Sequence, residues 1–343
     1  MTTSLPRQDR IRRALELLRD KTTDKFDEIV PVEAGEYTDP VLAKEERDYI
    51  FGAVPSIVAH SSELARPHDF MTIQMPRNNL LIVRQKDGGV KSFVNLCRHR
   101  GAMLEDRDKG RCRIFSCGYH RWSYDPDGSL RAITRDNTFG EVDRGEHGLI
   151  EIPTEERHGF IWVVDNAKAD INVAEWLGPD IDPMLASYPL EDLVCYKAAG
   201  FDEPTNWKIM QDAFLDGYHI QYAHPNTAGK IIHTNVMAFE DFGRHCRFIA
   251  PRKSIDRFLE EDPGDTPLDR YVTETHFIGP NSTLLRQPDH FQLLTFRPHP
   301  LDPIKSRMEQ RLFVPTVENS GMPPEKWEHV WNKNWDILLA VLH

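Results

Sequence analysis

The residues of this chain with the clearest chemical potential lie between Asn206 and His224, where an aspartate and two histidines follow the pattern D-x2-H-x4-H. Asp216 and His219 are three residues apart, so a helix would place them on one face. His219 and His224 are five apart, or roughly 140° out of phase, so one regular helix cannot direct both at one point. Because Pro225 disfavours the helical conformation at His224, we expect the helix to end before that residue. His224 could then turn back toward His219.

Two imidazoles with a carboxylate from elsewhere in the chain would form the 2-His-1-carboxylate site of non-haem iron oxygenases. Histidines in an aromatic-rich segment are also commonly packed or surface residues, so this stretch alone leaves both interpretations open. A second motif upstream favours the metal.

That motif consists of two Cys-His pairs. Cys97 and His99 are separated by one residue, and Cys117 and His120 by two. Two thiolates and two imidazoles suit zinc, or a Rieske 2Fe–2S cluster in which histidines replace the cysteines on one iron. Zinc sites more often take two ligands of one kind from each loop. The mixed pairs favour the cluster, with both thiolates on one iron and both imidazoles on the other.

Short strands must position the Cys-His pairs. Strand-like runs alternate with turn residues such as 86–89 and 125–128, which predicts an all-β domain over residues 55–165. The two pairs then lie on turns of this domain.

The rest of the chain has a different pattern. Strand-like runs occur at 247–250, 272–279, 282–286 and 291–297. Helical patterns occur at 7–20, 44–51 and 324–343. Together they predict an antiparallel sheet with helices packed on it, an α+β arrangement.

The Cys-His segments also resemble a known family signature. Residues 95–102 and 115–130 are similar to the Rieske motif of the aromatic-ring-hydroxylating oxygenase α subunits, C-x-H-R-G followed by C-P-Y-H-G-W and a downstream D-G. The chain departs from that motif at Gly118, where proline is usual, and at Arg121, where glycine is usual. Neither position is a ligand, so the resemblance still implies a cluster. Arg121 adds a positive charge beside His120 that could shift the cluster's potential or alter a docking surface.

The iron motif of the same family resembles residues 206–224, with Asp212 in place of glutamate and Ala213 in place of asparagine. The family's third iron ligand lies on a helix near the C-terminus, where Asp336 followed by Ile337 matches best. We expect Asp336 to be buried because it lies within an apolar run. The implied ligands are Cys97, His99, Cys117 and His120 for the cluster and His219, His224 and Asp336 for the iron.

The resemblance implies the terminal oxygenase component of a multicomponent Rieske system. Such an enzyme uses O2 and electrons from a ferredoxin or an NAD(P)H-dependent reductase to hydroxylate, or cis-dihydroxylate, an apolar aromatic or polycyclic substrate. The chain lacks a phosphate-cradling glycine motif, so we expect the reductase to be a separate protein. In the family, an electron relay would run from His120 of one subunit through Asp216 of its neighbour to His219. This implies a head-to-tail homotrimer, with or without a β subunit.

Two other functions stay open. A monooxygenase or demethylase of a quaternary ammonium, methoxy or N-methyl compound would use the same machinery. Relatives of that kind tend to carry glutamate at the relay position, so Asp216 favours ring hydroxylation. An electron carrier or zinc-stabilised binding protein would need little beyond the all-β domain, and the D-x2-H-x4-H motif argues against it.

The composition limits the classes of partner and the cellular compartment that we expect for this protein. The net charge of −12 over 343 residues argues against nucleic acid and anionic membranes as partners. The amino terminus lacks the apolar core of a signal peptide, and the apolar runs are too short to span a bilayer. Five cysteines in a chain of this size do not form a disulfide framework, so we expect a cytoplasmic protein.

The expected fold class is α+β, with an all-β Rieske domain inserted before an antiparallel-sheet-plus-helices catalytic domain. We expect residues 1–54 to form a helical segment that packs on the catalytic domain, 55–165 the Rieske domain, and 166–343 the catalytic mononuclear iron domain. Members of the family usually continue past the position of His343, so we expect the catalytic domain to be truncated here.

Overall fold

The computed structural model describes residues 7–26, 28–138 and 140–342. The chain divides into two compact units, which we call the β unit (residues 40–176) and the α+β unit (residues 1–39 and 177–343). The β unit therefore includes the stretches that flank the predicted all-β domain on both sides. It begins with a helix, α3 (Pro40–Glu45), followed by a π-helical segment, Glu46–Phe51.

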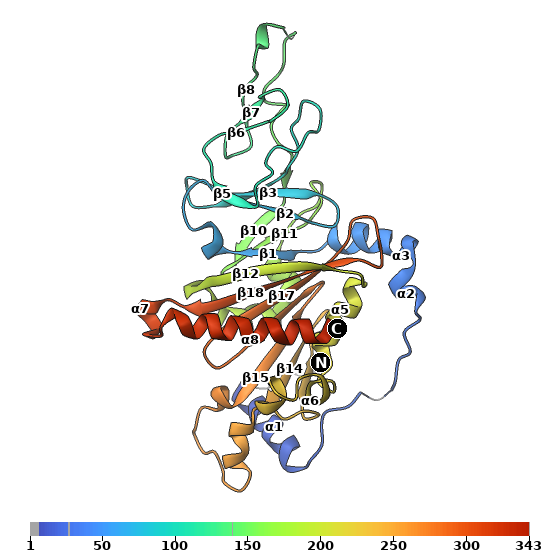
Figure 1. Cartoon of the computed structure of the whole chain (residues 1–343), viewed down its shortest axis with the longest axis vertical. Helices are drawn as coiled ribbons and strands as arrows, with labels where there is room; N and C mark the ends of the chain where they lie inside the picture. Colours follow the sequence, from blue (N-terminus) through green and yellow to red (C-terminus); the bar gives the residue numbers. More distant parts are fainter. Residues whose placement is uncertain (1–6, 27, 139, 343) are drawn as a thin grey trace. The chain divides into compact units, whose positions relative to one another are not determined.

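Three small antiparallel sheets form the body of the β unit (Figure 1). The five-stranded sheet has the order β5 (Lys109–Arg111), β2 (Asp69–Gln74), β3 (Asn79–Arg84), β4 (Val90–Val94) and β9 (Glu151–Ile152). A three-stranded sheet has the order β1 (Ser56–His60), β11 (Phe160–Val163) and β10 (Thr154–Arg157). The other three-stranded sheet has the order β6 (Phe115–Ser116), β7 (Ser123–Tyr124) and β8 (Leu130–Ala132). The predicted all-β character of this part of the chain is confirmed.

Strand β3 shows how the sequence divides the core of the β unit. Successive side chains of a strand point to opposite faces of its sheet. Leu81 and Val83 join the hydrophobic cluster that contains Cys97 and Cys117. The intervening Leu80 and Ile82 join a second cluster, with residues of β1 and β11. Both faces of the sheet are buried, which explains why β3 reads as a continuous apolar run rather than an alternating one.

The α+β unit is built on one seven-stranded antiparallel sheet, as the sequence predicted. Its order is β12 (Leu193–Glu203), β18 (Ser306–Pro315), β17 (Phe291–Pro298), β16 (Ser282–Arg286), β15 (Val272–Ile278), β14 (His245–Pro251) and β13 (Ala238–Asp241). The sequence analysis identified β14 to β17 and missed β12, β13 and β18.

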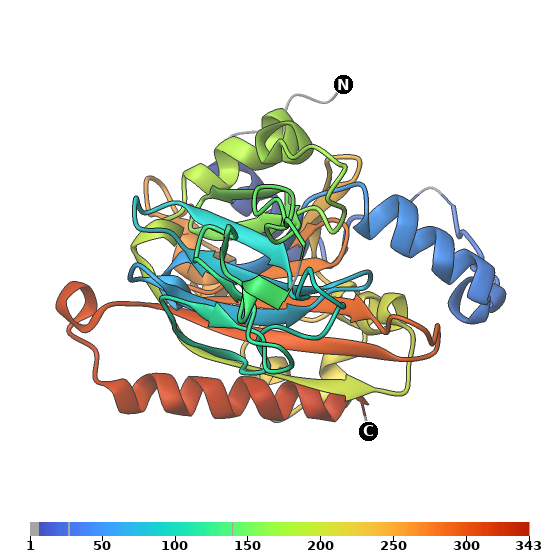
Figure 2. The same cartoon turned by 90° about the horizontal axis from the view of Figure 1, so that it is seen from above.

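Helices cover this sheet at several places. The apolar face of α1 (Arg7–Arg19), with Ile11 and Leu15, packs on Ile249 and Val272. Helix α8 (Pro324–Leu342) lies along β12 and β18 (Figures 1 and 2). Its Trp327 and Trp331 pack on residues of β18. The remaining helices are α2 (Gly35–Thr38), α4 (Val173–Ala186), α5 (Trp207–Leu215), α6 (Ile220–Ala223) and α7 (Val317–Ser320).

None of the helices in the described residues combines the length and the apolar composition that crossing a membrane would require.

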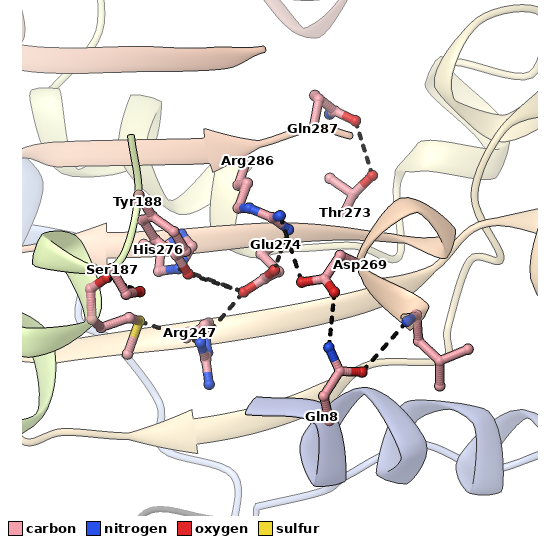
Figure 3. Close-up of polar contacts among 12 residues, drawn as sticks. Gln8, Ser187, Tyr188, Arg247, Asp269, Thr273, Glu274, His276, Arg286 and Gln287 are labelled. Atoms are coloured by element: carbon pink, nitrogen blue, oxygen red, sulfur yellow. Dashed lines mark hydrogen bonds and ion pairs between the residues drawn. The ribbon is translucent and has the colours of Figure 1, made fainter. Parts of the chain in front are cut away.

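A network of buried charges ties β14, β15 and β16 together (Figure 3). The carboxylate of Glu274 is fully buried and accepts hydrogen bonds from Arg286 at 2.7 Å and Arg247 at 3.3 Å. The hydroxyl of Tyr188 lies 3.2 Å from the same carboxylate and 3.0 Å from Nε2 of His276. Charged groups are buried in proteins where they are paired in this way. We therefore assign this network a structural role in the sheet.

Candidate metal sites

The two Cys-His pairs converge in the β unit. Nδ1 of His99 and Nδ1 of His120 lie 3.1 Å apart on the surface, while Cys97 and Cys117 are buried beneath them. Burial raises the pKa of the Cys97 thiol, and the neighbouring thiol of Cys117 raises it further. Thiolates turned inward and imidazole nitrogens turned toward one another fit a cluster with two sulfur and two nitrogen ligands.

Each pair lies on a turn of the same backbone design. In the first, the N–H of Cys97 donates to the carbonyl of Ala102 at 2.8 Å, and Gly101 N–H donates to Cys97 at 2.9 Å. In the second, Cys117 N–H donates to Trp122 at 2.9 Å, and Arg121 N–H donates to Cys117 at 3.0 Å.

Arg121 therefore occupies the position that Gly101 has in the first turn. Both residues have positive φ, 60° for Arg121 and 70° for Gly101. This left-handed conformation explains why glycine is usual at position 121 in the family motif. Gly118, the other departure, has open space where a side chain would lie, so the turn does not depend on glycine there.

Two aromatic residues, to which the sequence pattern assigned no role, lie beside the two Cys-His pairs. The Tyr124 hydroxyl accepts a hydrogen bond from Arg98 N–H at 2.9 Å and lies 3.4 Å from Sγ of Cys97. The ring of Trp122 stacks on His99 at 4.9 Å between centroids, with 11° between the planes. Trp122 is the last residue of the stretch that resembles C-P-Y-H-G-W. Tyr124 lies between that stretch and the downstream D-G.

In the α+β unit, the backbone around the iron motif differs from the predicted single helix. The side chain of Asn206 caps the start of α5 by accepting a hydrogen bond from Lys208 N–H at 2.9 Å. Helix α5 ends at Leu215, and Asp216 already has an extended conformation. The prediction that Asp216 and His219 share a helical face is therefore wrong, because the chain breaks between α5 and α6.

Gly217 lies at this break and is closely covered by the side chain of Met237. A Cβ atom at Gly217 would lie 1.7 Å from Cε of Met237, so no side chain fits there without rearrangement. The break still leaves Oδ2 of Asp216 3.6 Å from Nδ1 of His219. Oδ1 of Asp216 accepts a hydrogen bond from Tyr218 N–H at 2.7 Å, which fixes the carboxylate at the turn.

His219 and His224 converge as the sequence predicted. Helix α6 ends at Ala223, and the backbone of His224 leaves the helical conformation, so the two rings approach to 5.3 Å between centroids. His224 is buried, and burial, then the neighbouring His219, lowers the pKa of its imidazole. Nε2 of His224 has no hydrogen-bond partner among the described residues. A buried, unpartnered nitrogen beside a second imidazole fits a metal site.

Both histidines line a cavity of about 330 Å³ in the α+β unit. Apolar side chains supply part of its wall, among them Phe214, Ile231, Leu294 and Leu338. Polar side chains supply another part: Arg252, Thr273, Gln287, Asp289, His290 and Gln292. Met210, Leu215 and Gly217, which lie in the same segment as Phe214, do not line the cavity.

The carboxylate expected as the third iron ligand does not join the histidines here. Asp336 lies on α8, as predicted, but it is exposed rather than buried. The helix turns Lys333, Asn334 and Ile337 toward the cavity, and Asp336 lies on the adjacent side. The expectation of burial is wrong because the apolar residues around Asp336 belong to more than one face of the helix. Within the described residues no group of three or more potential metal ligands is assembled.

Two known protein families match this chain. The Rieske [2Fe-2S] domain family matches residues 55–143, and the ring hydroxylating alpha subunit (catalytic domain) family matches residues 190–338. The chain belongs to the α subunits of the Rieske-type ring-hydroxylating oxygenases. The cofactors of this Rieske oxygenase α subunit are therefore a 2Fe–2S cluster and a mononuclear non-haem iron.

Its relatives act on different kinds of compound. The large subunit of anthranilate 1,2-dioxygenase from Acinetobacter baylyi is 30% identical over 57% of this chain and 43% of its own length. The oxygenase subunit of carnitine monooxygenase from Acinetobacter pittii is 30% identical over 57% of this chain and 53% of its own length. The matched part of the chain thus spans about half the length of these curated relatives.

Solved structures share the fold. A quaternary ammonium Rieske monooxygenase with a bound inhibitor superposes with a TM-score of 0.77 at 21% identity, over 90% of this chain and 81% of that chain. A naphthalene 1,2-dioxygenase variant bound to phenanthrene superposes with a TM-score of 0.69 at 18% identity, over 90% of this chain and 77% of that chain. At these identities the likeness concerns the fold alone.

Proposed function

We propose that this chain is the terminal oxygenase component of a multicomponent Rieske system. It takes electrons from a separate ferredoxin or reductase and uses O2 to hydroxylate a small organic substrate. The observation that carries the proposal is the cavity lined by His219 and His224, in which Nε2 of His224 lacks a hydrogen-bond partner among the described residues. Membership of the family supports the same function.

The proposed cluster ligands are Cys97, His99, Cys117 and His120, and the proposed iron ligands are His219, His224 and Asp336. When bound, these groups supply the one-electron and O2 chemistry. The residues of the chain bind and orient the substrate. Oδ2 of Asp216 lies 3.6 Å from Nδ1 of His219 and would favour a proton on that nitrogen, so that Nε2 would be free to hold the iron; such outer carboxylates fix both tautomer and ring direction.

Asp336 enters this ligand set through the family resemblance. It is the one proposed iron ligand that the geometry leaves outside the cavity, while α8 contributes cavity residues on either side of it. The carboxylates that do line the cavity are Asp216 and Asp289. Asp289 is engaged by Lys326 and by Nδ1 of His290, so it is less suited to bind a metal.

The cavity favours a ring compound over a quaternary ammonium compound. Proteins recognise quaternary ammonium groups through the faces of several aromatic rings. Of the described residues that line the cavity, Phe214 alone carries a phenyl, phenol or indole ring. The carnitine and anthranilate enzymes match the chain equally well, so similarity does not choose between these substrates. We therefore propose hydroxylation of an aromatic ring, and keep the monooxygenase or demethylase as the second candidate.

The proposed assembly is a head-to-tail homotrimer in the cytoplasm, with or without a β subunit. In such a ring, Asp216 of one subunit would stand between His120 of its neighbour and its own His219. The exposure of His120 and of Asp216 in the single chain supports this role, because both side chains are accessible to a second copy.

A single-turnover experiment tests the function. Protein reduced with dithionite, freed of the excess, is mixed with isotopically labelled O2 and a panel of aromatic, quaternary ammonium and N-methyl compounds. We expect labelled hydroxyl groups on an aromatic compound with the native chain, and none with His224→Ala, which retains the cluster. Turnover of the ammonium or N-methyl compounds alone would favour the second candidate. A metal-replete protein that hydroxylates nothing in the panel would contradict the proposal.

A further inference from the structure

Two cationic side chains of the cavity lining form no ion pair in the described part of the chain. Arg252 and Lys333 both line the cavity. Neither side chain has a carboxylate within ion-pairing distance in the part of the chain that the structure describes. A half-buried cation without a counter-ion is costly, so this arrangement calls for an explanation.

The backbone holds Arg252 in a fixed place. Arg252 directly follows β14, and its N–H donates a hydrogen bond to the carbonyl of Tyr271 at 2.8 Å. It also forms an isolated β-bridge with Ile232, another residue of the cavity wall. The start of the side chain is therefore fixed by two neighbouring segments.

The guanidinium is held from one side only. Its Nη1 donates to Oε1 of Gln287 at 2.9 Å, and Oγ1 of Thr273 donates to the same oxygen at 3.1 Å (Figure 3 shows the Thr273–Gln287 bond). The amide oxygen of Gln287 is thus shared between two donors. A guanidinium has five N–H donors in a planar fork, and Gln287 uses one of them.

The carboxylate that acts electrostatically on Arg252, Asp289, is hydrogen-bonded to other residues. Burial lowers the pKa of the Arg252 guanidinium, and the charge of Asp289 opposes that change. However, Oδ2 of Asp289 accepts a hydrogen bond from Lys326, and its Oδ1 lies 2.7 Å from Nδ1 of His290. These two contacts strongly lower the pKa of Asp289, hydrogen bonding to His290 first, so the carboxylate stays ionised and both of its oxygens already have partners other than Arg252.

We propose that Arg252 binds an anionic substituent of the substrate, so that the substrate is a carboxylated or sulfonated aromatic compound rather than a neutral hydrocarbon. The inference rests on the proposed oxygenase function and adds the substrate class. Planar anions accept two parallel hydrogen bonds from a guanidinium, which fixes orientation as well as position. The ring then lies among the apolar residues near Phe214 and the two histidines. A cavity of about 330 Å³ suits one substituted ring.

A pair of matched probes tests this assignment without catalysis. Benzoate and benzamide have nearly the same shape, but only benzoate is charged. Their dissociation constants are measured by calorimetry on the metal-loaded protein in the absence of O2. We expect benzoate to bind at least about tenfold more tightly, because hydrogen bonds to charged groups are the stronger ones. In Arg252→Met the preference should vanish while the affinity for benzamide stays the same.

Three further variants keep the test interpretable. Arg252→Lys retains the charge and should keep part of the preference, even if Arg252→Met proves less stable. Arg257→Met removes an exposed arginine a few residues further along, outside the cavity, and should leave both affinities unchanged. Lys333→Met reports whether the positive charge of the cavity in general, rather than Arg252, selects the anion.

The outcomes separate this inference from the proposed function. Equal binding of benzoate and benzamide, a preference that persists in Arg252→Met, a preference that Lys333→Met alone removes, or no binding of benzoate at all would overturn the anion site. The oxygenase function could still stand, and would be judged by labelled product from neutral aromatic compounds. Absence of the mononuclear iron with intact benzoate selectivity would instead contradict the function and leave the anion site.

Discussion

The hydroxyl of Tyr124 lies 3.4 Å from the sulfur of Cys97 and accepts a hydrogen bond from the backbone N–H of Arg98. Because that N–H occupies an acceptor site of the hydroxyl, the hydroxyl proton is free to point at the sulfur. A hydrogen bond to a cluster sulfur stabilises the reduced, more negative state and so raises the reduction potential.

Tyr124→Phe should therefore lower the reduction potential of the cluster. We expect a decrease on the order of 50 mV, the equivalent of one hydrogen bond for a one-electron couple. Potentiometric titration followed by EPR measures it. Tyr119→Phe is a matched control, because Tyr119 is exposed and packs on His120 without reaching a sulfur. Equal potentials in the native protein and Tyr124→Phe would remove the role of the hydroxyl.

Asp216 gives the second prediction. Its carboxylate lies 3.6 Å from Nδ1 of His219. In our proposal this nitrogen does not bind the metal. Asp216→Ala should keep both metals yet slow electron transfer from the cluster by about 100-fold, the scale of effects at outer carboxylates. Rapid-mixing absorbance of cluster re-oxidation by O2 with substrate present gives the rate. Asp241→Asn, an exposed change on β13, serves as the control. Native rates in Asp216→Ala, with both metals bound, would exclude the relay.

The third ligand can be identified by comparing two carboxylates. Asp336 is exposed on α8, and Asp289 lines the cavity but is engaged by Lys326 and His290. We expect Asp336→Ala to lose most of the mononuclear iron while the cluster stays intact, and Asp289→Asn to retain it. Iron per chain and the cluster's EPR signal, measured on the same samples, give the answer. The reverse pattern would assign the ligand to Asp289.

The buried imidazole of His276 should make the free energy of unfolding depend on pH. Burial lowers the pKa of this imidazole to about 4, with Arg247 and Arg286 acting in the same direction and Glu274 opposing them. Its other neighbours are the Tyr188 hydroxyl and the carbonyl of Leu284, to which Nδ1 donates at 3.1 Å.

The direction of the change in stability with pH follows from the pKa of His276 in the folded and in the unfolded chain. An unfolded histidine has a pKa of about 6.5, so between about pH 6.5 and pH 4 the unfolded chain binds a proton that the folded chain does not. The free energy of unfolding should therefore fall through this range by up to about 3 kcal/mol from this residue, and no further below it. His276→Asn, which keeps a donor for Leu284, should flatten the profile measured by urea unfolding. Parallel profiles for the two proteins would show that His276 does not titrate as described.

The two Cys-His turns were predictable because each lies within a short stretch of sequence. Cys97 and His99 share one turn, Cys117 and His120 share another, and local sequence specifies both turns. The end of α6 before His224 was predictable for the same reason, since the adjacent proline acts on the neighbouring backbone.

Other features depend on distant parts of the chain. Strand β18 was missed because its buried polar residues, such as Arg311 and Gln310, break the apolar alternation, and only the fold shows that Glu309 pairs with Arg311. The contact between Arg252 and Gln287 joins the residues that follow β14 and β16, two strands that flank β15, and no local pattern connects them. The exposure of Asp336 depends on how α8 is rotated against the sheet.

The claim that the chain holds a Rieske cluster and a mononuclear iron is tested most directly by two measurements. These are the metal content of the native chain, purified without O2, and EPR of the dithionite-reduced protein. We predict about three irons per chain, two in the cluster and one at the histidines, and a rhombic signal with the low average g value of a Rieske centre. Zinc in place of iron, with no such signal, would contradict the assignment of both sites.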